Sequence, residues 1–398
     1  MVPLRLGRRF RSEPRTRFVT SPAAEALPRS ARDRLSRRAV VFIAGGGTGG
    51  HLMPALAIAE ELRRRRPELE PVLLGAQRGL EATLLPQRTF RYHLLPVEPI
   101  YRRQWWKNFR WPLIALNLRR ELIRLFETEQ PVAVIGTGGY ASGPCVWFAA
   151  RRGIPTAIQE QNAFPGIATR QLSRLVRHVY LGLPEARARL KLGRETQVFD
   201  TGNPIIPPDP SRREAAAARL GVVGGKPVLL ITGGSQGSLA LNETVAAWIE
   251  SGGAKDIVVL WATGKGSYSQ FASLHQPPAV KVFDFIDPMA DAYSVADLVV
   301  ARAGMMTGAE LCAWGLPSIL IPLPSAAADH QTKNAEALAA AGAAKMLRQR
   351  DLTVASFAQS VGGLLHDQNR RLEMGRAALA RGKPHALDSI LSHLLTLF

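Results

Sequence analysis

Three glycines near the start of the sequence have the spacing of a nucleotide-binding turn. Gly45, Gly47 and Gly50 form G-x-G-x-x-G between an apolar run and an amphipathic one, which is the pattern of a dinucleotide site. Such a site also needs an acidic residue at the end of the next strand, and that strand ends VLLGAQRG without one. No Lys-Ser/Thr pair follows the glycines, which excludes a P-loop. The glycines therefore let another group approach the backbone closely, without either nucleotide signature.

A second glycine turn, ITGGSQGS (231–238), repeats this arrangement. Gly233, Gly234 and Gly237 would present backbone N–H groups at a helix N-terminus, where the helix dipole favours an anion. Ser235 adds a hydroxyl. The alternative is a tight strand-to-helix turn that binds nothing. Two such turns in one chain favour a site for a phosphorylated molecule.

The segment RAGMMTGAEL (302–311) places a carboxylate three residues after a threonine. This spacing is typical of a capping box, in which Thr307 would cap a helix and Glu310 would accept a bond from the N–H of the cap. The alternative is a carboxylate at the start of a helix that accepts hydrogen bonds from both hydroxyls of a ribose. Spacing alone favours the cap.

The segments around these motifs alternate between strand and helix patterns. Short β-rich runs such as AVVFIA and VAVIG are followed by amphipathic stretches, one with Pro54 suited to a first helical turn and one from Pro112 to about Glu127. Such alternation predicts parallel sheets with helices on both faces. The same pattern resumes after the proline-rich stretch 201–211, so we expect two doubly wound halves whose carboxyl ends face a cleft.

The composition limits the class of protein. The chain has 398 residues and a net charge of +19, which fits two domains and an anionic partner. Its two cysteines, Cys145 and Cys312, lie in apolar segments and are expected in the core, with neither a disulfide framework nor a metal site. No run of about 18 apolar residues predicts a membrane span. Residues 1–38 are expected to form a basic disordered arm, and its role as a tail, a transit peptide or an anionic-surface contact stays open.

Eight blocks of the sequence, taken in order, carry a resemblance to a known family. They are GGGTGGHLMPALAIAEEL, GTGGYASGP, QEQNAFPG, TGNP, GGSQGS, FIDPMADAYSVADLVVARAG, TGAELCAWGLPSILIPLP and DHQTKNAEAL. They resemble the UDP-N-acetylglucosamine:N-acetylmuramyl-(pentapeptide) pyrophosphoryl-undecaprenol N-acetylglucosaminyltransferases, which make lipid II of bacterial peptidoglycan. The resemblance covers residues 40–395 and implies an α/β protein of the GT-B fold, with two Rossmann-like domains.

The resemblance also implies a division of labour between the domains. Residues 39–203 would bind the acceptor and the membrane, and residues 204–383 would bind the UDP-sugar donor. A C-terminal helix at about 384–398 would pack back on the first domain.

For the donor, the resemblance implies inverting transfer of N-acetylglucosamine from UDP-N-acetylglucosamine without a metal or other cofactor. No Asp-x-Asp motif occurs in the chain, so backbone N–H groups and helix dipoles would balance the charge of the departing UDP. Ser235 would bind the diphosphate, Glu310 the ribose and Gln331 the N-acetylglucosamine. The full donor set is Thr48, Gly49, Gly50, Asn162, Ser235, Ile286, Met305, Met306, Thr307, Glu310 and Gln331.

Some positions depart from the family pattern. Ile206 stands where an arginine usually contacts the donor, so this contact is either lost or supplied from elsewhere, for example by Arg212 or Arg213. Gln159 stands where a histidine is usual, and the two methionines beside the nucleotide replace smaller or branched residues.

The reaction also needs a group that takes the proton of the acceptor hydroxyl, the muramyl 4-OH of lipid I. His51 is the best candidate for this general base, because imidazole titrates near neutral pH. The alternative is that His51 only hydrogen-bonds the loop or a phosphate. The acceptor contacts implied by the resemblance are Gly138, Gly139, Tyr140, Glu160 and Gln161.

The segment IYRRQWWKNFRWPLIAL (100–116) interleaves cations with aromatic side chains. This mixture is typical of a monotopic membrane patch, and the alternative is a partly buried loop that caps the next helix. We expect a peripheral protein on the cytoplasmic face of the plasma membrane, with UDP-N-acetylglucosamine, lipid I and an anionic membrane surface as partners, and no nucleic acid. The predicted patch consists of Arg102, Arg103, Trp105, Trp106, Lys107, Phe109 and Trp111.

Three other classes fit less well. A UDP-sugar epimerase shares the two-domain architecture but has no need of a membrane patch. A nucleic-acid binder could use the arm and the tryptophans, but it leaves the glycine turns unexplained. A nicotinamide oxidoreductase lacks its ribose-binding acid.

Overall fold

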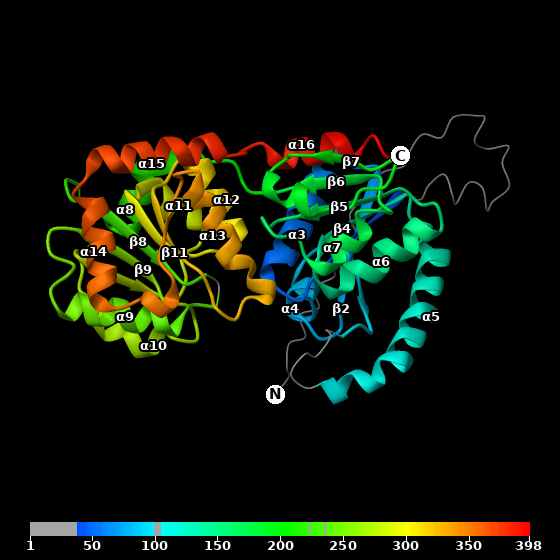
Figure 1. Ribbon diagram of the computed structural model, residues 1–398, viewed down its shortest axis with the longest axis horizontal. Helices are drawn as coiled ribbons and strands as arrows, with labels where there is room; N and C mark the ends of the chain where they lie inside the picture. Colours follow the sequence, from blue (N-terminus) through cyan, green and yellow to red (C-terminus); the bar gives the residue numbers. More distant parts are fainter. Residues whose placement is uncertain (1–37, 99–104, 223, 235) are drawn as a thin grey trace, which may run out of the picture. The chain divides into compact units, whose positions relative to one another are not determined.

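The computed structural model describes residues 38–98, 105–222, 224–234 and 236–398. Its two parallel sheets both lie within one structural unit, Val40–Phe398 (Figure 1). Several predicted site residues lie outside the described part, namely Arg102, Arg103, Ser235 and the side chains of Trp105 and Lys107.

The first sheet has seven strands in the order β3-β2-β1-β4-β5-β6-β7, and all its pairs are parallel. Its central strands are buried on both faces, which explains why they read as continuous apolar runs. The strands are β1 (Ala39–Gly45), β2 (Leu69–Ala76), β3 (Arg91–Leu95), β4 (Ala133–Gly138), β5 (Thr156–Glu160), β6 (His178–Leu181) and β7 (Gln197–Phe199). The helices are α3 (Gly49–Arg65), α4 (Leu80–Leu84), α5 (Trp111–Glu129), α6 (Gly139–Arg151) and α7 (Ile167–Leu172).

The second sheet has six strands in the order β10-β9-β8-β11-β12-β13, again all parallel. Its strands are β8 (Val228–Thr232), β9 (Val258–Ala262), β10 (Val280–Phe283), β11 (Leu298–Arg302), β12 (Ser318–Ile321) and β13 (Lys345–Met346). Its helices are α8 (Arg213–Leu220), α9 (Leu239–Glu250), α10 (Tyr268–Phe271), α11 (Met289–Val295), α12 (Met305–Trp314), α13 (His330–Ala340), α14 (Val354–Leu365) and α15 (Gln368–Arg381).

Each sheet reverses its strand order once, between β1 and β4 in the first and between β8 and β11 in the second. In open parallel sheets, ligands bind outside the carboxyl ends of the strands at this point. The turns or helix starts that follow β1, β4 and β11 contain the predicted site residues Thr48, Gly49, Gly50, His51, Gly139, Tyr140, Met305, Met306 and Thr307.

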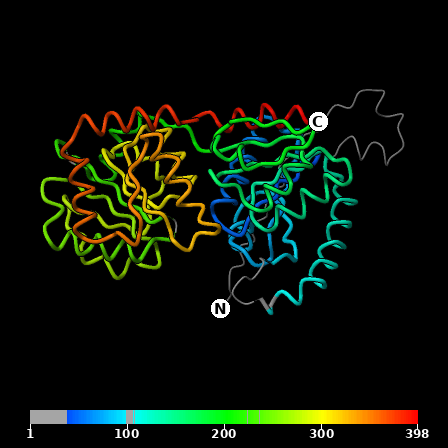
Figure 2. Tube along the Cα trace, in the orientation of Figure 1, coloured from blue at the N-terminus to red at the C-terminus, as the bar shows by residue number. Residues whose placement is uncertain are grey.

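The last helix, α16 (Ala386–Leu394), contacts α3 and β6 of the first sheet. Figure 2 shows this red C-terminal segment beside the first sheet. An ion pair between Arg65 and Asp388 joins α16 to α3, and Arg381 at the end of α15 pairs with Glu185 at 2.7 Å. The chain thus crosses between the sheets a second time after α15.

Several sequence predictions are corrected by these elements. The helix expected to begin near Pro54 begins at Gly49, so Pro54 lies inside α3. Proline lacks the N–H that would bond the carbonyl of Gly50, four residues earlier. The short strands β3, β5, β6, β7, β10 and β13 were not predicted from the sequence. Cys145 and Cys312 are buried free thiols, as expected.

None of the helices in the described part of the chain combines the length and the apolar character that a bilayer span requires.

Candidate active site

The glycine turns after β1 and β4 pack against each other. Gly139 has φ +79°, and a Cβ at this position would overlap the carbonyl oxygen of Gly46. A Cβ on Gly138, with φ +100°, would meet the imidazole of His51 at 2.5 Å. Only glycine adopts these conformations without strain and leaves this space. The glycines of the first sheet therefore bring two parts of the chain together around His51.

The side chain of Glu81 holds the glycine turn that follows β1. Its carboxylate is fully buried and accepts hydrogen bonds from the backbone N–H of Gly47 and of Ala76, both at 2.8 Å. The sequence analysis missed Glu81, because an isolated glutamate in a short polar segment gives no signal of burial.

His51 lies in the first turn of α3 and is held from two directions. Its Nδ1 lies 3.0 Å from Oε1 of Gln161, and its carbonyl accepts a bond from Thr137 Oγ1 at 2.8 Å. Burial lowers the pKa of His51 below 6.5, while the charge of Glu160 and the bond to Gln161 oppose this shift. Burial is the largest of these effects, so the imidazole is neutral near pH 7 and able to accept a proton.

Three buried amides continue from His51 into the sheet. Gln161 Nε2 donates to the carbonyl of Thr137 at 2.7 Å and also to Oε1 of Gln159. Gln159 Nε2 donates to Asn203 Oδ1 at 2.8 Å, and Asn203 Nδ2 donates to the carbonyl of Gln161 at 3.1 Å. The three side chains are at most 3% exposed.

Glu160 organises the loop after β5. Its Oε1 accepts bonds from the N–H and the side-chain amide of Asn162, both at 3.1 Å, and its Oε2 accepts from Gly166 N–H at 3.1 Å. Asn334 of α13 reaches this loop as well, accepting from Ala163 N–H at 3.0 Å and donating to Asn162 Oδ1 at 3.1 Å. Asn334, which the sequence analysis missed, therefore links helix α13 to the loop after β5.

The capping box predicted at Thr307 is wrong. Helix α12 begins at Met305 with Gly304 as its N-cap, so Thr307 is the third helical residue. Glu310 instead accepts a hydrogen bond from the hydroxyl of Tyr293 at 2.9 Å. Burial raises the pKa of Glu310 above 4.5, and the bond from Tyr293 opposes this shift. The glycine supplies the helix start, because it has the extended backbone of a cap without a capping side chain.

The remaining donor candidates lie on the second sheet and its helices. Ile286 and Met305 are buried, Met306 and Thr307 are half-buried, and Gln331 Oε1 accepts from Leu323 N–H at 2.9 Å. Thr48, Gly49 and Gly50 lie at the start of α3, the helix that follows β1, and Thr48 is its N-cap.

The two arginines proposed to replace the one missing at position 206 are engaged elsewhere. Arg212 pairs with Asp291 at 3.1 Å, and Arg213 donates to the carbonyl of Ser294 at 2.7 Å, so both hold α11. The side chain of Ile206 itself is 83% exposed.

Arg302 is a cation that the sequence analysis did not single out. It ends β11 and is only 9% exposed. Its guanidinium donates to Ser238 Oγ at 2.5 Å and to Gln349 Oε1 at 2.7 Å. No carboxylate of the described residues pairs with it. A lone arginine in the apolar run LVVAR was the signal that could have found it.

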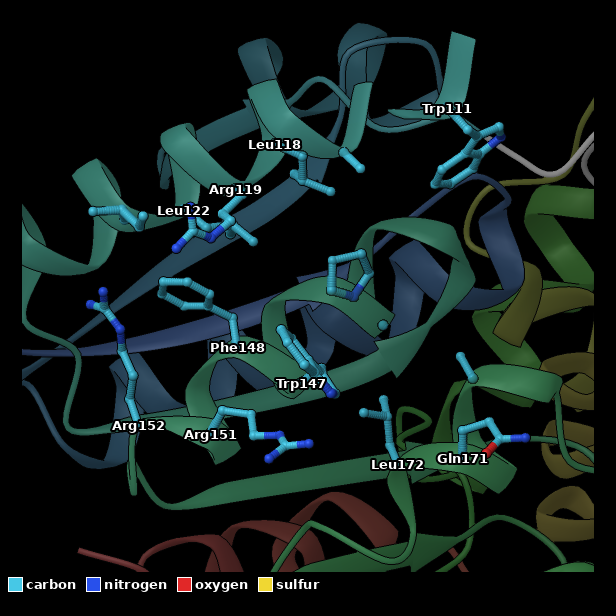
Figure 3. Close-up of a pocket in the computed structure, with 15 residues that line it drawn as sticks. Trp111, Leu118, Arg119, Leu122, Trp147, Phe148, Arg151, Arg152, Gln171 and Leu172 are labelled. Atoms are coloured by element: carbon cyan, nitrogen blue, oxygen red, sulfur yellow. The ribbon is translucent and has the colours of Figure 1, made fainter. Parts of the chain in front are cut away.

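The described part of the predicted membrane patch adjoins an apolar groove, which is lined by the half-buried Trp111. Trp106 and Phe109 are 55% and 74% exposed. The groove, of about 720 Å³, lies between α5, α6 and α7. Figure 3 shows Leu118 and Leu122 of α5 facing Trp147 and Phe148 of α6, with arginines at one end. These arginines are Arg119, Arg151 and Arg152.

Within the described ranges, no group of three or more His, Cys, Asp or Glu side chains is placed to hold a metal ion.

Two parallel, doubly wound domains, with glycine turns at the carboxyl ends of their central strands, are the architecture of the GT-B fold. Residues 41–181 match the glycosyltransferase family 28 N-terminal domain, and residues 228–390 match the glycosyltransferase family 28 C-terminal domain. The chain therefore contains both halves of this enzyme architecture.

The chain belongs to the family of UDP-N-acetylglucosamine–N-acetylmuramyl-(pentapeptide) pyrophosphoryl-undecaprenol N-acetylglucosamine transferases. It is 40% identical to the member from Desulforudis audaxviator over 88% of this chain and 96% of that protein. It is 36% identical to the member from Chlorobium phaeobacteroides over 90% of this chain and 99% of that protein. The crystal structure of Acinetobacter baumannii MurG covers 90% of this chain, with a TM-score of 0.72 and 28% identity, and the match spans 99% of that chain. The protein is thus a hexosyltransferase that transfers N-acetylglucosamine.

Proposed function

We propose that the enzyme transfers N-acetylglucosamine from UDP-N-acetylglucosamine to the muramyl 4-OH of lipid I, with inversion and without a metal ion. The observation that carries this proposal is His51, neutral and oriented, in a turn at the switch point of the first sheet. In the reaction, a bond forms between O4 of the acceptor and the anomeric carbon as the bond from that carbon to UDP breaks. UDP leaves with the electron pair, and His51 takes the proton of the hydroxyl. A single displacement of this kind inverts the anomeric centre.

The donor is proposed to lie against the second sheet. Glu310 would accept hydrogen bonds from the ribose hydroxyls, and its neighbour Tyr293 orients the carboxylate through the bond at 2.9 Å. Ile286 would meet the uracil through its backbone, Met305, Met306 and Thr307 would flank it, and Gln331 would hold the N-acetylglucosamine. The turn that contains Ser235 would bind the diphosphate.

The diphosphate charge is proposed to be balanced by the protein alone. Helices α9 and α12 begin beside the switch point and have no acidic residue in their first turns, which favours an anion at their N-termini. Arg302 adds a full positive charge that donates to Ser238, the N-cap of α9. These groups would do the work that a divalent cation does in other transferases.

The acceptor is proposed to approach the first sheet from a membrane surface. Gly138, Gly139 and Tyr140, with Glu160 and Gln161, would frame its diphosphate and sugar, and Thr48, Gly49, Gly50 and Asn162 would reach the donor. The exposed aromatic side chains near α5 and the apolar groove with its arginines support contact with an anionic bilayer. The enzyme would then act as a peripheral protein on the cytoplasmic face of the plasma membrane.

A transfer assay with labelled UDP-N-acetylglucosamine and lipid I tests the proposal. We expect formation of lipid II with a β-linked sugar, at the same rate in excess EDTA. Loss of activity in EDTA that magnesium or manganese restores would refute the metal-free account. Turnover of UDP-N-acetylglucosamine alone to another UDP-sugar would instead indicate an isomerase.

A further inference from the structure

The buried amides behind His51 form a hydrogen-bonded chain whose direction is fixed at both ends. At one end, Gln161 Nε2 meets the carbonyl of Thr137 at 2.7 Å. At the other, Asn203 Nδ2 meets the backbone carbonyl of Gln161 at 3.1 Å. A backbone carbonyl can only accept a hydrogen bond, so the nitrogen of each side-chain amide must point toward it. Neither amide can be turned around without placing two acceptors face to face.

Gln159 then has one possible orientation. Its Nε2 donates a hydrogen bond to Asn203 Oδ1 at 2.8 Å. Its Oε1 accepts a hydrogen bond from Nε2 of Gln161. The same amide therefore gives one hydrogen bond and takes one. Gln159 is 1% exposed, so no solvent competes for either bond.

The orientation of the Gln161 amide determines which nitrogen of His51 carries the proton. With its nitrogen committed to Thr137 and Gln159, the amide of Gln161 presents only Oε1 to His51 Nδ1, at 3.0 Å. An acceptor opposite Nδ1 requires that Nδ1 carry the proton, which leaves Nε2 of the neutral ring with a free lone pair.

We infer that Gln159 and Asn203 are positioning residues, which hold the amide of Gln161 so that His51 is the Nδ1–H tautomer and Nε2 is the basic nitrogen. This inference rests on the proposed role of His51 as general base. Asn203 is itself held in place, because it fills the space beside Gly182, where a Cβ would overlap its amide. Two other titratable groups influence His51, namely Glu160 of β5 and His330 of α13, and neither hydrogen-bonds to the imidazole.

The first test reads the tautomer directly. In the full chain labelled with 15N-histidine, two-bond 15N–1H correlations at a pH above the pKa of His51 distinguish a protonated Nδ1 from a protonated Nε2. The His51→Asn variant identifies the signal among the eight histidines. We expect the proton on Nδ1. A proton on Nε2 in the wild-type enzyme would overturn the inference without any variant having to fold.

The second test removes the amide in the middle of the chain. Gln159→Met keeps the length of the side chain but has neither donor nor acceptor hydrogen bonds to offer. Gln161 Nε2 keeps the backbone carbonyls of Thr137 and Gln159 as acceptors in this variant, so we expect the amide to be held less tightly, with a minor second tautomer signal and a fall of a fewfold in the plateau value of kcat. We also expect the acid limb of the pH–rate profile to move to lower pH, because the hydrogen bond that His51 Nδ1 donates to Gln161 Oε1, which raises the pKa of His51, is weakened. Unchanged tautomer and unchanged kcat would contradict the inference.

Two further variants separate positioning from stability. Gln159→His replaces the amide by an imidazole that can also donate one bond and accept one, so we expect it to restore the tautomer and most of kcat. Asn242→Leu removes a buried amide of helix α9, which bonds Thr263 and Trp261, and should lower stability without altering the signal of His51. If Asn242→Leu changes that signal as Gln159→Met does, the effect is general loosening and the inference is wrong.

The role of His51 as base is tested separately by the activity of His51→Asn. General-base catalysis contributes about 10²–10⁴-fold, so kcat should fall by that factor. A wild-type kcat in this variant would remove His51 from the reaction and refute the proposed base, whereas the tautomer measurement would still report the orientation of Gln161.

Discussion

A Cβ added to Gly139 in the first sheet would overlap the backbone of Gly46, whereas one added to Gly234 or Gly304 in the second sheet would meet no atom within 4 Å. Both sheets use a glycine between a central strand and the helix that follows it. In the first sheet the glycines allow the protein to pack against itself around His51. In the second half Gly233 and Gly237 are also packed against backbone, but Gly234 and Gly304 leave open space near the starts of α9 and α12. The same local pattern thus packs the backbone around the proposed proton acceptor in one half and leaves room for the proposed diphosphate contact in the other.

The surfaces of the two halves differ in a related way. Exposed large apolar side chains gather near α5, among them Trp106, Phe109 and Leu113, and adjoin the apolar groove. In the second half such side chains, for example Leu372, are found on α15. The cluster near α5 supports the proposal that the half with the proposed acceptor site contacts lipid.

The largest expected effect tests this difference between the surfaces. Replacing Trp106, Phe109 and Leu113 together by serine should reduce the partition constant for anionic liposomes at least about a hundredfold, because each large apolar side chain contributes about 1.5–3 kcal/mol when fully buried. Sedimentation with liposomes measures it. A control variant in which Ile206, Leu372 and Leu379, which are similarly exposed, are replaced by serine should bind liposomes as the wild type does. Equal losses in both variants would show that the two surfaces are equivalent.

The second prediction compares the glycines directly. Gly139→Ala should lower the free energy of unfolding by about 1–3 kcal/mol or more, because alanine is strained at φ +79° and its Cβ would overlap Gly46. Gly304→Ala, at φ −67°, should cost less than about 1 kcal/mol but raise KM for UDP-N-acetylglucosamine severalfold. Denaturant unfolding and donor kinetics measure the two effects. Equal destabilisation by both variants would show that the two glycines do not differ in their importance for packing.

The third prediction concerns the ribose contact proposed for the second half. Glu310→Ala removes a charged acceptor whose bonds are worth about 1.5–3 kcal/mol each. We expect at least about a tenfold drop in kcat/KM for UDP-N-acetylglucosamine. The wild type should discriminate against the 2′-deoxyuridine donor, and the variant should largely cease to do so. Wild-type discrimination in the variant would show that Glu310 does not touch the ribose.

The smallest expected effect is a pH dependence of stability in the absence of donor. The pKa of Glu310 in the folded protein is raised above 4.5 by burial. The stability that its protonated form contributes is therefore fully present below the unfolded pKa and is lost as the pH rises through the folded pKa. The Glu310→Gln variant has no proton to lose, so its Tm should match that of the wild type at acid pH and exceed it increasingly toward neutral pH. A constant difference in Tm at all pH values would contradict the raised pKa.

Local pattern identified much of the fold and part of the site. The glycine turns at 45–50 and 233–238 could be predicted from the sequence, because each joins a wholly apolar strand to a helix. The helix start at Thr307 was wrong, since a Thr-x-x-Glu spacing competes with a glycine that caps equally well. The start of α3 was misplaced because Pro54, common in a first turn, is tolerated five residues further inside.

By itself the sequence determined the α/β class, the two glycine turns, the basic aromatic segment near 105 and, through its ordered blocks, the family. These are properties of residues close together in the chain, which local sterics and periodicity express directly. Only the tertiary structure decided which side chains surround them. Glu81 reaches the first glycine turn from 34 residues away, and Asn203 reaches Gln159 from 44 residues away. The direction of a hydrogen bond depends on what lies opposite in space, and for His51 that partner is set by strand order in the sheet, which no local pattern contains.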